Sequence, residues 1–130
     1  MKKRILVADD EKAVVRILTD RLTHWGYEVD SACDGEETLR KVGSFKPDLL
    51  LLDLKMPRLS GMRVLEENRC RGHRIPVLIL TALPPEAMAG SCLAEGADDY
   101  ICKPFDTRRI RESVERIFST SSDGAIHEQP

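Results

Sequence analysis

The stretch that decides the fold is PDLLLLDLKMP, residues 47–57. Its four consecutive leucines show no apolar–polar alternation, which is typical of a strand buried on both faces of a sheet. The run leads directly into Asp53. A carboxylate beside a dry core is costly unless a partner neutralises it. We therefore expect a central strand over residues 47–53 that ends in a functional acid.

On both sides of this strand, apolar runs alternate with segments of helical period. The expected strands are 4–8, 27–32, 47–53, 75–82 and 98–102, and the expected helices are 13–25, 34–42, 62–70, 85–95 and 106–118. Strands that are apolar throughout and alternate with helices are typical of a parallel sheet covered on both faces. The pattern predicts an α/β fold with a doubly wound, five-stranded parallel sheet.

The length and composition are those of one soluble domain. The chain has 130 residues, and its 20 Lys and Arg against 22 Asp and Glu give a formal net charge of −2. We expect a domain over residues 1–118 and a disordered tail or the start of a linker over 119–130, which is polar and rich in turn-forming residues. A near-balanced charge argues against direct nucleic-acid contact by this domain.

Three further features predict a cytoplasmic protein without membrane contact. The longest apolar runs, such as IPVLILTAL (75–83), are too short to span a bilayer. The first residues, MKKRILVADDE, reach acidic residues too early for a signal peptide. The 4 cysteines lack metal-binding spacing and are interpreted as reduced packing thiols.

Polar side chains stand at the ends of four expected strands. They are Asp9, Asp10, Asp53, Thr81 and Lys103. Each alone would pass for a helix cap or a turn former. Ligands of doubly wound sheets, however, gather beyond the carboxyl ends of the strands, where all of these groups would meet. Carboxylates that repel one another in one cleft favour a bound Mg²⁺. With a lysine and a hydroxyl beside them, they suit a phosphoryl group, and Asp53 is the best candidate nucleophile.

These motifs resemble the receiver domain of two-component response regulators over residues 3–118. The shared motifs are ILVADDE (5–11), PDLLLLDLKMP (47–57) followed by Gly61, PVLILTA (76–82) and EGADDYICKPF (95–105). The resemblance implies a flavodoxin-like (βα)5 fold with strand order 2-1-3-4-5, as in a chemotaxis receiver.

The resemblance also implies roles for individual residues. Asp53 would accept a phosphoryl group from a sensor histidine kinase or a phosphotransfer protein. Mg²⁺, or Mn²⁺, would be bound by Asp10, Asp53 and the backbone carbonyl of Lys55, and by Asp9 through water. The domain would be a signalling switch in a two-component system or phosphorelay, not an enzyme on external substrates. It would catalyse only its own phosphorylation and dephosphorylation.

The remaining implied residues concern the switch. Thr81 would turn toward the phosphoryl group, Lys103 would pair with it, and Tyr100 would move inward as Thr81 moves. The Lys103–Pro104 bond would be cis. The surface of the fourth helix, fifth strand and fifth helix would then change and control an output domain or a downstream protein.

Three alternative functions can each be compared with particular residues of the sequence. A phosphatase or phosphotransferase of the haloacid-dehalogenase type carries a second acid two residues after the nucleophile, where this chain has Lys55. A receiver-like interaction module without chemistry would lack some of the site residues, which are all present. A flavin-binding protein would need a Ser/Thr/Gly-rich loop in place of ADDEKAV (8–14).

The chain departs from the receiver pattern in three places. Winged-helix regulators carry a basic, an acidic and a basic residue at the positions of Ala89, Arg109 and Ser113. We therefore do not expect this chain to dimerise in the way that those regulators do. PRLSG (57–61) lacks the acidic residue that often precedes its glycine. The two prolines at 84–85 are expected to stiffen the loop after Thr81 and to reduce its movement.

Overall fold

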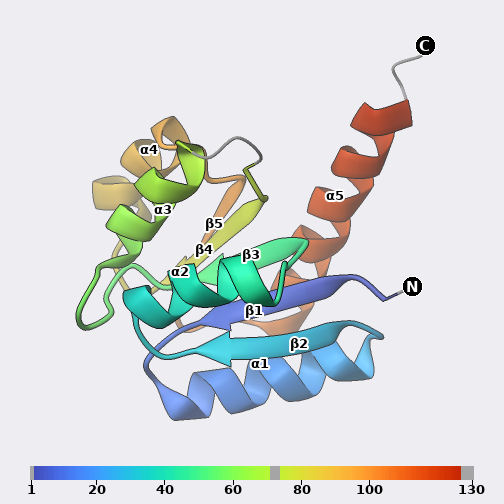
Figure 1. Cartoon of the computed structure of the whole chain (residues 1–130), viewed down its shortest axis with the longest axis horizontal. Coiled ribbons are helices and arrows are strands. Elements are labelled where there is room, and N and C mark those ends of the chain that lie inside the picture. Colours follow the sequence, from blue (N-terminus) through green and yellow to red (C-terminus); the bar gives the residue numbers. More distant parts are fainter. Residues whose placement is uncertain (1, 71–73, 127–130) are drawn as a thin grey trace.

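The computed structural model describes residues 2–70 and 74–126. Its strands are β1 (Arg4–Ala8), β2 (Glu28–Ala32), β3 (Leu49–Leu52), β4 (Val77–Thr81) and β5 (Asp99–Cys102). Its helices are α1 (Lys12–His24), α2 (Gly35–Ser44), α3 (Gly61–Arg69), α4 (Pro85–Ala94) and α5 (Thr107–Ile126). The strands are parallel and lie in the order β2-β1-β3-β4-β5 (Figure 1). The predicted doubly wound fold and strand order are confirmed.

Helices cover both faces of the sheet and create two separate cores (Figure 1). Successive side chains of a strand point to opposite faces. Leu49 and Leu51 of β3 therefore pack with α1 and α5, whereas Leu50 and Leu52 pack with residues of α3 and α4. All four leucines are at most 1% exposed. This two-sided burial explains why β3 is an uninterrupted apolar run.

The register brings the carboxyl ends of the strands to one edge of the sheet. Ala8 at the end of β1 lies opposite Leu52 at the end of β3. Thr81 at the end of β4 lies opposite Cys102 at the end of β5. The residues that the sequence singled out lie at these strand ends or directly after them, so the parallel register itself assembles the site.

One predicted boundary is wrong. The last helix was expected to end at residue 118, but α5 continues to Ile126. Residues 119–126 are therefore part of this helix. Extending an existing helix adds one hydrogen bond for each residue fixed, which costs far less than nucleating a new helix. Residues 127–130 lie outside the described part of the chain. The domain end at residue 118, with a disordered tail or the start of a linker over 119–130, stays a prediction.

Among the described residues, no helix combines the length and the apolar character that crossing a membrane requires.

Candidate functional site

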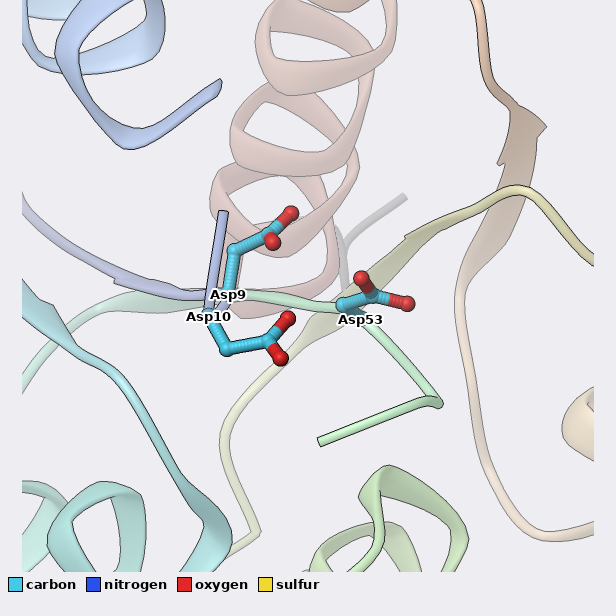
Figure 2. A group of neighbouring side chains, drawn as sticks. All are labelled: Asp9, Asp10 and Asp53. Carbon is cyan, nitrogen blue, oxygen red and sulfur yellow. The ribbon is translucent and has the colours of Figure 1, made fainter. Parts of the chain in front are cut away.

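Three aspartates converge beyond the carboxyl ends of β1 and β3. Asp53 follows β3, and its backbone N–H donates to the carbonyl oxygen of Ala8 at 2.9 Å, which ties it to the end of β1. Asp9 and Asp10 follow that strand directly. Each aspartate offers a carboxylate oxygen, and these oxygens all lie within 4.8 Å of one another (Figure 2). Asp9 and Asp53 are buried, whereas Asp10 is exposed.

Lys103 supplies the positive charge of the site. Its Nζ lies 2.8 Å from Asp9 Oδ2 and 3.0 Å from Asp53 Oδ2. A third carboxylate, that of Glu11, lies 2.6 Å from the same Nζ. The Lys103 side chain is only 10% exposed, so its ion pairs with the buried Asp9 and Asp53 are poorly screened by solvent. Three carboxylates thus share one ammonium group, and Asp10 adds a fourth carboxylate to the lining of the cleft, so the site carries a net negative formal charge.

The pKa values of the buried pair reflect this arrangement. Burial raises the pKa of Asp9 above its ordinary value, although the Lys103 ammonium and the Glu11 N–H oppose the rise. Burial by itself would lower the pKa of Lys103, but hydrogen bonds to Asp9, Glu11 and Asp53 raise it well above its usual value. Lys103 therefore stays protonated at neutral pH.

Backbone amides hold two of the carboxylates in place. Glu11 N–H donates to Asp9 Oδ1 at 2.9 Å, and Lys55 N–H donates to Asp53 Oδ1 at 3.1 Å. Hydrogen bonds of this kind stabilise the ionised form and restrict its orientation. Asp53 thus has one oxygen on the Lys55 amide and the other on Lys103.

Thr81 and Tyr100 meet at the backbone of Leu83. The fully buried Thr81 accepts a hydrogen bond from Leu83 N–H through its hydroxyl oxygen at 3.4 Å. The Tyr100 hydroxyl donates to the Leu83 carbonyl oxygen at 2.7 Å. Burial is the main cause that raises the pKa of Tyr100 to about 12, so the phenol remains protonated. One residue therefore links the cleft to the half-buried tyrosine.

A cleft of about 270 Å³ joins these groups. It is lined by Asp10, Glu11, Asp53, Lys55, Thr81, Ala82 and Lys103. Asp9 lies beside it through its contact with Lys103, whereas Tyr100 is connected to it only through Leu83. The Lys103–Pro104 peptide bond is cis.

Glu11 is the site residue to which the sequence assigned no role. It stands next to Asp10 in the ADDE motif, and this run of three acids was the available signal. Its partner Lys103 is 92 positions away in the chain, so only the folded chain reveals the pair.

The donor set fits a hard divalent cation. Carboxylate oxygens are the ligands that Mg²⁺ prefers, and it keeps several waters when protein ligands are few. Three carboxylates with oxygens within 4.8 Å of one another match that requirement, and a cation would relieve their mutual repulsion.

Comparisons with known proteins show the family to which the chain is similar. The family model of the response regulator receiver domain matches residues 5–115. The alkaline phosphatase synthesis transcriptional regulatory protein PhoP of Bacillus subtilis is 42% identical over 125 residues, which are 96% of this chain and 52% of that protein. The chain thus spans about half the length of the curated relatives that it matches.

Solved structures of receiver domains are also similar to this chain. The receiver domain of the Francisella response regulator 1452 superposes with a TM-score of 0.87 at 29% identity, covering 92% of this chain and 99% of that one. The receiver domain of the Pseudomonas aeruginosa sensor histidine kinase PA1611 superposes with a TM-score of 0.83 at 26% identity, covering 92% and 99%. That structure has a magnesium ion coordinated in its active site cleft.

Proposed function

The chain belongs to the response regulator receiver domain family, and we propose that it is a phosphorylated switch whose acceptor is Asp53. Receiver domains of this family act as signalling switches in two-component systems. The observation that carries the proposal is the setting of Asp53: a buried carboxylate that lines a small cleft and is oriented by the Lys55 amide and Lys103.

The proposed reaction transfers a phosphoryl group from a phosphohistidine to Asp53. A carboxylate oxygen of Asp53 forms the new O–P bond, while the N–P bond of the donor breaks and its electron pair stays on the imidazole. The Lys103 ammonium group exchanges its contact with Asp53 Oδ2 for a contact with the phosphoryl oxygens, whose negative charge it stabilises.

The carboxylates around Asp53 are proposed to hold Mg²⁺ or Mn²⁺. Asp10, Asp53 and the backbone carbonyl of Lys55 would be direct ligands, and Asp9 would act through water. When bound, the ion supplies charge neutralisation for the phosphoryl oxygens. The magnesium in the cleft of the PA1611 receiver supports this assignment.

The proposed response starts at Thr81 and passes through Leu83. If the Thr81 hydroxyl turns to donate to a phosphoryl oxygen, the Leu83 N–H loses its acceptor. The same residue provides the acceptor for Tyr100, so a shift of Leu83 frees the tyrosine to move inward. The surface of α4, β5 and α5 then changes, which is the proposed signal.

Input and output follow from the family. The proposed donor is a sensor histidine kinase or a phosphotransfer protein. The PhoP relative is named as a transcriptional regulator of about twice this length, which supports an output domain or a downstream protein as the target. We propose that the domain works in the cytoplasm and does not itself contact nucleic acid or membrane.

The test is intact mass after incubation with acetyl phosphate and Mg²⁺. We expect one added phosphoryl group on the wild type, none on Asp53→Asn, and none with EDTA. Asp20→Asn is the matched control, because Asp20 is an exposed aspartate of α1 outside the cleft. If the adduct persisted in Asp53→Asn, or if neither acetyl phosphate nor a panel of kinases modified the wild type, the proposal would be wrong.

A further inference from the structure

The loop between β3 and α3, residues 53–61, is tied closely to the strand end at its base. Lys55 lines the cleft, and its amide holds the Asp53 carboxylate. Gly61 N–H donates to the Leu54 carbonyl oxygen at 2.9 Å. A Cβ on Gly61 would lie 2.2 Å from the carbonyl oxygen of Asp53, so this closure requires glycine. The loop is therefore closed directly next to Lys55.

The outer side of the same loop rests on the start of α2. A Cβ on Gly35 would lie 2.0 Å from the carbonyl oxygen of Leu59 and 2.5 Å from its Cβ. Gly35 is the first residue of α2, and it is buried. The loop and the helix therefore approach as closely as two segments can, and any side chain at Gly35 would push Leu59 away.

An ion pair fastens this contact. Arg58 has a φ of 69°, a left-handed conformation that non-glycine residues rarely adopt without support. Its Nε lies 3.2 Å from Asp34 Oδ2, and the Asp34 side chain is 14% exposed. The other oxygen, Oδ1, accepts the Glu37 N–H at 2.8 Å and caps α2. One carboxylate thus fixes both the helix start and the strained loop residue.

We propose that Asp34, Gly35, Arg58 and Leu59 form a clamp that positions Lys55 and Asp53 for cation binding in the cleft. This inference rests on the proposed function and assigns positioning residues that do not themselves line the cleft. When the clamp is open, the loop relaxes toward less strained backbone conformations. The Lys55 amide and carbonyl then spend less time in the arrangement that the cation requires.

An electrostatic role and a positioning role of Arg58 predict opposite changes in the cation affinity of the cleft. Removing a cation near an acidic cleft should strengthen the binding of a divalent cation if only the electrostatic field matters. Removing the anchor of the loop should weaken it. The substitution Arg58→Ala therefore separates a positioning role from a field effect.

The experiment measures Mn²⁺ affinity by the EPR signal of the free ion, using the intact chain. We expect Arg58→Ala to bind Mn²⁺ about three- to tenfold more weakly than the wild type, at the lower end of the effect of groups that orient metal ligands. Arg58→Lys keeps a cation for Asp34 and should recover most of the affinity. At saturating Mn²⁺, the rate of phosphorylation of Arg58→Ala should approach that of the wild type.

The matched control is Arg69→Ala. It removes a half-exposed arginine that pairs with Glu95 at 2.9 Å and does not line the cleft, so Mn²⁺ affinity should be unchanged or slightly higher. A wild type that binds no Mn²⁺ would overturn the proposed metal site and the clamp with it. A wild type that binds Mn²⁺ beside an Arg58→Ala variant that binds as tightly or more tightly would overturn the clamp alone.

Discussion

At the scale of single residues, the site depends on one lysine that compensates several acids. Asp9 is 3% exposed and Asp53 is 5% exposed, and both contact Lys103 Nζ. Two charged carboxylates at such depth are tolerated because an ammonium group and backbone amides replace the water that they lose. The same arrangement leaves Asp53 oriented toward an open cleft, which is what a nucleophile needs.

Replacing Lys103 by methionine should destabilise the protein at neutral pH. The variant leaves Asp9 and Asp53 buried without their counter-ion, at a cost of about 3 kcal/mol in the free energy of unfolding. The raised folded pKa of Lys103 means that its contribution is present below its ordinary value of 10.5 and is lost as pH rises through the folded value.

In acid, the difference between the wild type and Lys103→Met should shrink. Burial raises the pKa of Asp9 above 3.8, so on acidification this carboxyl takes up its proton earlier than an exposed aspartate would. Urea unfolding at about pH 7 and about pH 4 measures both values. A destabilisation that is equally large at the two pH values would contradict the role given to the ion pairs.

At the scale of elements, β5 is fastened to α5 through Asp99. Its Oδ2 accepts hydrogen bonds from the Ser113 hydroxyl and from Arg116, and Arg109 lies 3.5 Å away. Arg109 and Ser113 stand where winged-helix regulators carry an acidic and a basic residue, and both contact Asp99 of their own chain. The absence of that type of dimer stays a prediction.

The substitution Asp99→Asn should lower the free energy of unfolding by about 1–3 kcal/mol at neutral pH, since it removes charged hydrogen bonds at a partly buried site. Burial would raise the pKa of Asp99, but the Ser113 hydroxyl, the Tyr100 N–H and the two guanidinium groups lower it below 3.8. The stabilisation is therefore present above the ordinary pKa and disappears as pH falls through the folded one.

Urea titrations from about pH 7 to about pH 3 check this prediction. The wild type and Asp99→Asn should differ by a constant amount down to about pH 4 and converge only below it. Glu112→Gln is a suitable control, because Glu112 is an exposed acid of the same helix, and its stability should follow the wild type throughout. Convergence already near pH 6 would contradict the lowered pKa.

In the whole molecule, the three inner strands β1, β3 and β4 each contribute side chains to both cores, and β3 is the middle one. β3 lies between β1 and β4, so its side chains are covered by helices on both faces (Figure 1). Asp53 follows this strand directly, so the strand fixes the position of its backbone. The site is thus placed by the most buried part of the fold and completed by loops.

Truncating β3 should therefore cost more than truncating a surface position. Leu50→Ala removes a side chain that is 0% exposed, and we expect a loss of about 2–5 kcal/mol in the free energy of unfolding. Ile17→Ala, at a position that is 46% exposed, should change it by less than about 0.5 kcal/mol. Equal effects of the two substitutions in urea unfolding would contradict the assignment of β3 to the centre of both cores.

The elements, and the edge of the sheet at which the polar groups lie, can be predicted from the sequence alone. Four leucines in a row indicate two-sided burial, and helical periods on either side predict a parallel sheet. Parallel strands end at the same edge of a sheet, so the sequence alone predicts that the three aspartates, Thr81 and Lys103 lie together. The strand order came from the resemblance to receiver domains, because local periodicity contains no information on which strands are neighbours.

The contacts between individual polar groups could not be predicted from the sequence and are seen only in the folded chain. Glu11 pairs with Lys103 across 92 positions, and Leu83 joins Thr81 to Tyr100. Such contacts depend on side-chain distances and loop paths that arise when distant segments pack. The clamp between Arg58 and Asp34 belongs to the same class, since a left-handed arginine is stabilised by a helix that comes much earlier in the chain. The hydrophobic periodicity of a segment indicates which of its faces is directed at the core. Which polar groups pair with one another depends on how distant segments pack when the whole chain is folded.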